Sequence, residues 1–127
     1  MPFNRVLGIR VMRLHSDGVT IACEVRDELR NLAGMLHGGV IATMADAAVG
    51  IALARHFKAS RSGATAEMKI SYLRPIVEGK ATARARLLRV GAHLCVGRVD
   101  ILDAKRQLAA TAIVTYLLLE TSQPLDG

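Results

Sequence analysis

The feature that most constrains this sequence is a proline-free apolar segment that runs from position 38 to position 57. It is rich in Ala, Leu, Ile and Met, all of which are compatible with a helix. As a helix it would span roughly 30 Å, and it stays apolar on nearly every face until Arg55. A helix of this kind is usually enclosed on most sides. Because Asp46 stands near its middle, the segment is a poor membrane span, and the rest of the chain must cover it.

Segments typical of β-strands flank this helix on both sides. Two precede it and four follow it: 6–14, 19–25, 64–73, 80–90, 93–103 and 107–119. Short turns at 16–18, 75–79, 91–92 and 103–106 join successive strands, which predicts antiparallel pairing. This order favours an α+β architecture, in which one antiparallel β-sheet wraps around one long central α-helix. A single domain covering residues 1–127 is expected.

The formal net charge of +6 raises the question of an anionic partner. Nucleic acid, an anionic membrane and a phosphate-bearing small molecule are the three options. Arg84 and Arg86 alternate with apolar residues, as on the solvated face of a strand, and aromatic residues make up only 3% of the chain. No base-stacking surface or nucleic-acid motif is visible. We therefore expect neither a nucleic-acid nor a membrane partner, and a phosphate-bearing ligand remains compatible with the charge.

The two cysteines, Cys23 and Cys95, stand singly inside apolar stretches. Their spacing predicts neither a disulfide framework nor a metal site, and two reduced thiols in the core are expected. The N-terminal residues lack the apolar region of a signal peptide. The sequence therefore predicts a cytoplasmic protein with no metal and no cofactor.

Asp46 is the residue most informative about chemistry. Its helical neighbours are apolar, and no Lys or Arg stands three or four positions away. A buried carboxylate is destabilising unless it is paired or hydrogen-bonded. Its partner must come from elsewhere in the fold, or its site must be open to water and ligand. A structural Asp bonded to the backbone or to Thr43 is the alternative.

The segment His37-Gly38-Gly39 stands at the start of the predicted helix. Two glycines there let another molecule approach closely. The first helical N–H groups lack partners within the helix, and the helix dipole favours negative charge at this end. An oxyanion would be well placed against the Gly38 N–H, although an ordinary loop-to-helix junction explains the same residues. Asn31, six residues before His37, either orients a carbonyl or a water or forms a turn.

These features together are more specific than each alone. The segment 31–39, NLAGMLHGG, followed by Asp46, resembles the PaaI-like branch of the hotdog-fold thioesterases. The segment 63–75, GATAEMKISYLRP, is similar to the strand that follows the central helix in that family. Residues 3–9 and 109–116 also fit, so the resemblance covers nearly the whole chain.

The resemblance implies a hotdog fold and hydrolysis of an acyl-CoA substrate. Gly38 would supply the N–H that polarises the thioester carbonyl, and Asp46 would act as nucleophile or general base. Asn31 would help hold the carbonyl or the attacking water. Thr65 stands where related thioesterases carry a hydroxyl that assists the water. His37 would shape the loop or bind near the thioester.

The resemblance also directs attention to substrate-binding residues. Gly39 is expected to contact the substrate, and the phosphates of CoA need cations. Arg74 and Arg89 are the main candidates for that role, and Arg55 or Lys58 at the end of the helix is a further one, with solvation of the surface as the alternative for each. Aryl-acyl CoA, such as phenylacetyl-CoA, is the acyl group that the family favours, and medium-chain acyl-CoA comes next.

The spacing of the two main residues bears on the oligomeric state. Gly38 and Asp46 are eight residues apart, which is about 12 Å along one helix. Both cannot contact one thioester carbon within a single chain, so a shared site requires two chains. A homodimer is therefore the minimum unit, which agrees with the dimeric unit of the family, and the resemblance implies a homotetramer.

Two other functions compete with thioester hydrolysis. One is a hydratase or dehydratase of the hotdog fold that acts on acyl thioesters. Those families typically pair a His with an Asp or Glu in their motifs, and such motifs are not found in this sequence. The other is a non-catalytic protein that binds acyl-CoA. Asp46 argues against it, because a binding protein has no need of a carboxylate in an apolar helix.

Overall fold

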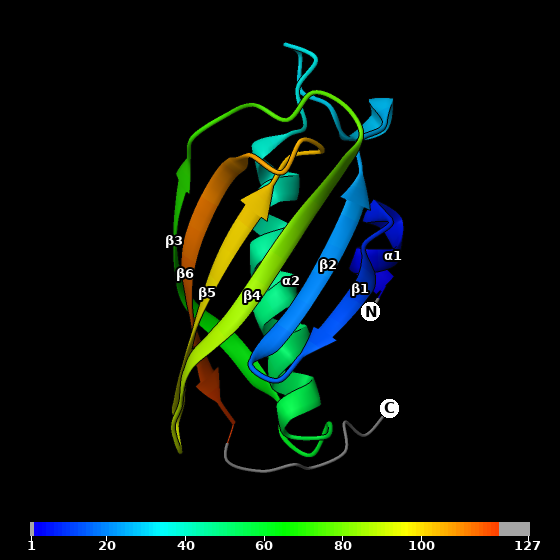
Figure 1. The fold of residues 1–127 in the computed structure, drawn as a ribbon. Helices are drawn as coiled ribbons and strands as arrows, with labels where there is room; N and C mark the ends of the chain where they lie inside the picture. The colour runs from blue at the N-terminus through cyan, green and yellow to red at the C-terminus, as the bar shows by residue number, and fades with distance from the viewer. Residues whose placement is uncertain (1, 120–127) are drawn as a thin grey trace.

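The computed structural model describes residues 2–119, which form an antiparallel sheet wrapped around the long helix α2 (Gly38–His56) (Figure 1). The strands are β1 (Arg10–His15), β2 (Gly18–Glu24), β3 (Gly63–Tyr72), β4 (Lys80–Val90), β5 (Leu94–Leu102) and β6 (Leu108–Leu118). A short helix α1 (Pro2–Leu7) and a 3₁₀ turn η1 (Asp27–Leu29) complete the elements. The order across the six-stranded sheet is β1-β2-β4-β5-β6-β3. The predicted α+β architecture is confirmed.

The first predicted strand, 6–14, is wrong at its N-terminal end. Residues Pro2–Leu7 form helix α1, and the strand begins only at Arg10. Proline is favourable in the first turn of a helix, where its missing N–H has no partner to lose. Gly8 then adopts a φ of +76° and donates its N–H to the Arg5 carbonyl at 3.0 Å, which ends the helix. The strand pattern of the sequence hid this short helix.

The predicted antiparallel pairing of strand 64–73 with strand 80–90 is also wrong. β3 pairs with β6 at the edge of the sheet, and β4 lies between β2 and β5. The connecting segment 73–79 crosses over the N-terminal end of α2 (Figure 1). Its Ile76 is fully buried, and the Ile76 carbonyl accepts the Leu36 N–H at 2.7 Å. The segment therefore closes one end of the core and is not a hairpin turn.

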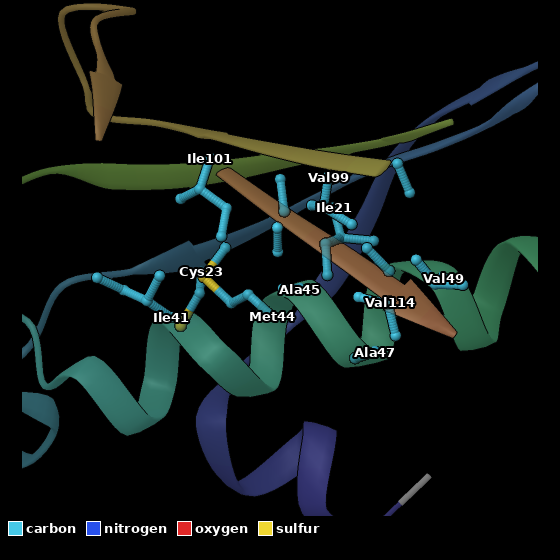
Figure 2. Packing of buried hydrophobic residues seen from close by; sticks show 14 of the residues in the cluster. Ile21, Cys23, Ile41, Met44, Ala45, Ala47, Val49, Val99, Ile101 and Val114 are labelled. Carbon is cyan, nitrogen blue, oxygen red and sulfur yellow. The ribbon is translucent and has the colours of Figure 1, made fainter. Parts of the chain in front are cut away.

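The core lies between α2 and the concave face of the sheet, as Figure 2 shows for Met44 and Val49 of the helix and Ile101 and Val114 of the sheet. Alanines dominate the contact: buried examples are Ala45, Ala48, Ala81, Ala83, Ala85, Ala110 and Ala112. A Cβ added at Gly97 of β5 would lie 2.7 Å from a methyl carbon of Val49. Small residues on both layers thus let helix and sheet approach closely.

Among residues 2–119, α2 is the one helix whose length and apolar composition would suffice to cross a membrane. It is also the helix that the sheet wraps (Figure 1). Its apolar character is therefore that of a core helix, as the sequence predicts.

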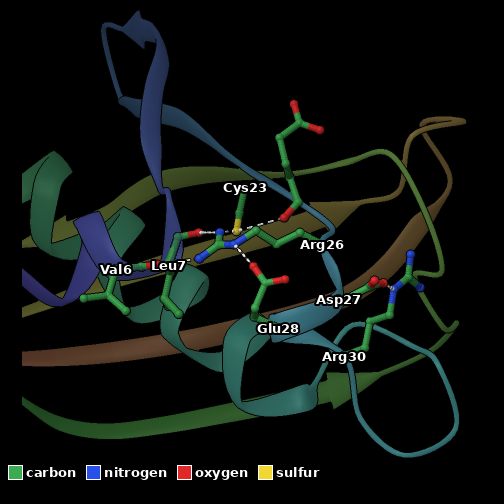
Figure 3. Close-up of polar contacts among 8 residues, drawn as sticks. Val6, Leu7, Cys23, Arg26, Asp27, Glu28 and Arg30 are labelled. Carbon is green, nitrogen blue, oxygen red and sulfur yellow. Dashed lines mark hydrogen bonds and ion pairs between the residues drawn. The ribbon is translucent and has the colours of Figure 1, made fainter.

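Arg26 fastens α1 to the sheet (Figure 3). Its guanidinium donates to the carbonyls of Val6 at 2.6 Å and Leu7 at 2.9 Å, which are at the C-terminal end of α1. The Cys23 thiol donates to the same Leu7 carbonyl at 3.1 Å. Replacing Arg26 by Met keeps the apolar stem and removes these bonds. We expect the free energy of unfolding, measured with urea, to fall by about 1–2 kcal/mol.

Arg10→Met is the matched control for that change. Arg10 contacts Glu24 at 3.2 Å, and both side chains are more than half exposed. Such a pair contributes less than about 1 kcal/mol. Equal losses for the two variants would contradict the role of Arg26 at the end of α1.

Candidate active site

The N-terminal end of α2 presents a single free amide. The His37 ring caps the helix, because its Nδ1 accepts the Gly39 N–H at 2.8 Å. The Val40 and Ile41 N–H groups donate to the His37 carbonyl. Within residues 2–119, no acceptor lies within hydrogen-bond range of the Gly38 N–H. A donor at the positive end of the helix dipole therefore remains for a ligand.

Gly38 forms part of the wall of a cleft of about 380 Å³, together with Asn31, Tyr72 and Arg74. The Tyr72 hydroxyl donates to the Gly38 carbonyl at 2.9 Å. A Cβ at Gly38 would lie 3.5 Å from the Tyr72 ring, so a longer side chain there would crowd the cleft. The Gly38 carbonyl is thus held by Tyr72, while the Gly38 N–H stays free.

Asn31 forms a turn and also lines this cleft. Its Oδ1 accepts the N–H groups of Ala33 at 3.0 Å and Met35 at 3.1 Å. Its Nδ2 group makes no hydrogen bond to any other described residue. The oxygen therefore shapes the loop, as the turn interpretation predicts, and Asn31 also stands on the cleft wall.

Asp46 receives its partners from two strands, as the absence of a helical partner predicts. Thr65 of β3 donates its hydroxyl to Asp46 Oδ1 at 2.5 Å. The Tyr116 hydroxyl of β6 lies 2.9 Å from Oδ1 and also 2.9 Å from the Asp46 backbone carbonyl. Thr43 is not a partner, since its hydroxyl donates to the Gly39 carbonyl at 2.8 Å. The expectation of a buried Asp46 needs correction, because the carboxylate is only half-buried in this chain.

Tyr116 is a residue that the sequence does not single out. Burial and the nearby negative charge of Asp46 raise the pKa of Tyr116 to about 12, against a smaller opposing effect of the Thr65 hydroxyl. The phenol therefore stays protonated at neutral pH and serves as a donor. One signal of a special contact was available in the sequence. Gly50 stands inside the helix one turn after Asp46, at a position where glycine is unfavourable. A Cβ at Gly50 would lie 2.8 Å from the Tyr116 hydroxyl oxygen.

Asp46 faces a second cavity, of about 530 Å³, which is separate from the Gly38 cleft in the residues that line it. Its walls are mostly apolar and include Phe3 of α1, Ile51 of α2 and Leu118 of β6. The two halves of the predicted site therefore occupy different hollows of one chain. Nothing within residues 2–119 brings the Gly38 amide and the Asp46 carboxylate to one cavity.

The remaining predicted residues are distributed between the two ends of the sheet. Arg74 lines the Gly38 cleft. Arg89 is exposed near the C-terminal end of β4 and does not line that cleft. The Gly39 N–H is already bonded to His37. Among residues 2–119, no three His, Cys, Asp or Glu side chains lie close enough together to hold a metal ion.

Comparison with known proteins identifies the family. A sequence model described as the thioesterase superfamily matches residues 33–110, more than half of the chain. The chain belongs to the thioesterase superfamily. This superfamily protein is 34% identical to the medium/long-chain acyl-CoA thioesterase YigI of Escherichia coli, over 93% of its own length and 86% of YigI. The predicted PaaI-like thioesterase family and the predicted enzyme class, a thioester hydrolase, are confirmed.

Solved structures of related proteins have the same fold. The phenylacetic acid degradation protein PaaI of Thermus thermophilus is 27% identical to this superfamily member, with a TM-score of 0.84 over 94% of this chain and 100% of PaaI. The thioesterase HI1161 of Haemophilus influenzae superposes with a TM-score of 0.90 at 22% identity, over 98% of this chain and 87% of HI1161. The second likeness concerns the fold, and both confirm the hotdog architecture.

Proposed function

We propose that this protein hydrolyses the thioester of a medium-chain or aryl acyl-CoA to a free acid and CoA. The observation that carries the proposal is that the chain holds both a free Gly38 amide at a helix N-terminus and an Asp46 carboxylate bonded to two hydroxyls. The amide suits a carbonyl that becomes an oxyanion. The carboxylate suits a nucleophile or general base. Membership of the thioesterase superfamily supports the same chemistry.

The apolar cavity beside Asp46 supports the choice of acyl group. Its side chains include Phe3, Ile51 and Phe57, and Asp46 is among its few polar groups. Apolar pockets with a few placed polar groups are typical small-molecule sites. The relative YigI is called a medium/long-chain acyl-CoA thioesterase. An aliphatic or aryl tail would fit such walls, with the thioester carbon beside the carboxylate.

The free edge of β3 supports a site shared between two subunits. β3 is an edge strand of ten residues, most of them exposed. An exposed edge strand offers unpaired backbone groups to another strand. If β3 pairs with the β3 of a second copy in antiparallel fashion, the Thr65 end of one strand lies beside the Tyr72 end of the other. Asp46 would then approach Gly38 of the partner subunit, and the two hollows would meet.

The chemistry in this arrangement is a hydrolysis. The carbonyl oxygen accepts the Gly38 N–H, while Asp46 attacks the carbonyl carbon or takes a proton from a water that does. A C–O bond forms and the C–S bond breaks, with CoA leaving as a thiolate. When Asp46 is the nucleophile, water cleaves the resulting anhydride. Asn31 Nδ2 would hold the carbonyl or the water, Thr65 would assist the water, and His37 would keep the helix end in place.

The charged part of the substrate would lie at the mouth of the Gly38 cleft. Arg74 stands on its wall, where a guanidinium can bind a CoA phosphate. Arg89 would serve the same purpose from the far end of β4 of the partner subunit. A homodimer is the minimum unit in this proposal and a homotetramer the expected one. The two unpaired cysteines, both buried, support a cytoplasmic location.

Release of free thiol from a panel of acyl-CoAs tests the proposal. We expect turnover with medium-chain or aryl acyl-CoA, followed with a chromogenic thiol reagent, and slower turnover with acetyl-CoA, which leaves the apolar cavity empty. Hydration of crotonyl-CoA without thiol release would instead indicate a hydratase. Acyl-CoA binding without any turnover would indicate a non-catalytic binding protein.

A further inference from the structure

We propose that Tyr116 is a positioning residue that fixes the rotation of the Asp46 carboxylate, so that Oδ1 is held and Oδ2 is directed at the thioester or its attacking water. The inference rests on the proposed function, because it assigns a reacting oxygen to Asp46. Tyr116 itself need not touch the substrate. Its effect would pass through Asp46.

The hydrogen bonds to the Asp46 carboxylate all reach one of its two oxygens. Thr65 and Tyr116 both reach Oδ1, at 2.5 Å and 2.9 Å. No described residue lies within hydrogen-bond range of Oδ2. The terminal torsion of an aspartate is broad and roughly two-fold, so a carboxylate with no such partners would exchange its two oxygens. Two hydroxyls on the same oxygen remove that freedom and leave the other oxygen for chemistry.

Tyr116 differs from Thr65 in what else it contacts. Its hydroxyl also lies 2.9 Å from the backbone carbonyl of Asp46. A phenol has one proton, which can be donated to either oxygen. The hydroxyl therefore places the carboxylate relative to the backbone of α2, whereas Thr65 reaches only the side chain. With Thr65 as its only partner, the carboxylate would be positioned relative to β3 and not relative to the backbone of α2.

Gly50 provides the space that Tyr116 needs. It lies four residues after Asp46 on the same helix face, and a Cβ there would come within 2.8 Å of the Tyr116 hydroxyl oxygen. An alanine would favour the helix by roughly 1 kcal/mol. Glycine is unfavourable in the helix, but at this position it leaves the space that the phenol occupies. Two residues from separate elements thus serve one contact with Asp46.

Tyr116→Phe is the principal test, because it removes one oxygen and keeps the ring. We expect kcat for acyl-CoA hydrolysis to fall on the order of 10- to 100-fold, since a displaced reacting group loses rate on that scale. KM should change less than about twofold, because ground-state binding is not involved. Thr115→Val, the neighbouring position on β6, is the control and should match the wild type.

A double variant separates the contact from general damage to the fold. Gly50→Ala should lower kcat by displacing the phenol. In the Tyr116→Phe background the same alanine meets no hydroxyl, so it should lower kcat little further. Independent structural damage would instead make the two losses multiply, and that result would overturn the proposal.

The NMR chemical shift of a labelled Asp46 carboxyl carbon, recorded at one neutral pH, tests the contact without turnover. The chemical shift should change in Tyr116→Phe, because Oδ1 loses a hydrogen-bond donor, and stay unchanged in Thr115→Val. An unchanged chemical shift, or an active Tyr116→Phe enzyme with wild-type kcat, would refute the positioning role. Loss of the proposed function has a different signature: a wild type without acyl-CoA hydrolysis, or an Asp46→Asn variant that keeps it.

Discussion

Asp46→Asn is expected to lower kcat for acyl-CoA hydrolysis on the order of 10³-fold or more, while the protein stays folded. An amide has the shape of the carboxylate but is a poor nucleophile and a poor base. Its oxygen can still accept the hydroxyls of Thr65 and Tyr116, which reach Oδ1 in the wild type. Thiol release measures kcat, and urea unfolding measures stability. The loss should appear in kcat, with acyl-CoA binding largely preserved.

Asp103→Asn is the matched control for this substitution. Asp103 Oδ1 accepts the N–H groups of Lys105 and Gln107, each at 2.9 Å, in the turn before β6. The oxygen of an asparagine can accept the same bonds, so activity should equal that of the wild type. A wild-type rate in Asp46→Asn would remove Asp46 from the chemistry.

Mixing two inactive variants is expected to restore hydrolysis, which is the second large effect. One variant is Asp46→Asn, and the other is Gly38→Val, whose branched side chain would enter the cleft beside Tyr72. In a mixed dimer with sites built across subunits, one site combines the intact Asp46 of one chain with the intact Gly38 of its partner. Random exchange of equal amounts would give about a quarter of the wild-type activity, because half of the dimers are mixed and each carries one intact site.

The same experiment distinguishes a composite site from a site within one chain. If Gly38 and Asp46 of the same chain acted together, every chain in the mixture would carry a defect and no activity would return. Subunit exchange must be verified, for example by mass spectrometry of one isotopically labelled variant. Verified exchange with no activity would therefore argue against the shared site.

The fold was largely predictable because its strongest signal is local. A long apolar helix followed by alternating strands leaves few architectures. The two errors concern information that an alternating strand pattern does not carry. Gly8 ends a short helix with a positive φ, which a strand pattern cannot reveal. β3 pairs with the distant β6 instead of its neighbour β4, and the segment between β3 and β4 buries Ile76 in the core.

The candidate site was predictable from chemistry, but its supporting contacts were not. A carboxylate in an apolar helix and glycines at a helix start are visible in the sequence, since each conflicts with its surroundings. Tyr116 gives no such signal, because a tyrosine near the end of a strand is ordinary. Only the position of β6 relative to α2 reveals its bond to Asp46. Gly50 is visible as an irregularity in the helix, yet its reason appears only with Tyr116 in place.

The alanines between α2 and the sheet have a consequence for chemistry as well as for packing. Because alanine side chains are small, α2 lies close to the sheet. The distance between helix and sheet decides how long a side chain must be to reach from one to the other. Here two of the shortest polar side chains, those of Asp46 and Thr65, meet across the gap. Enlarging a buried alanine such as Ala45 would lift the helix and separate them, even far from any substrate. The size of the core side chains therefore also determines the distance between the reactive groups of α2 and the sheet.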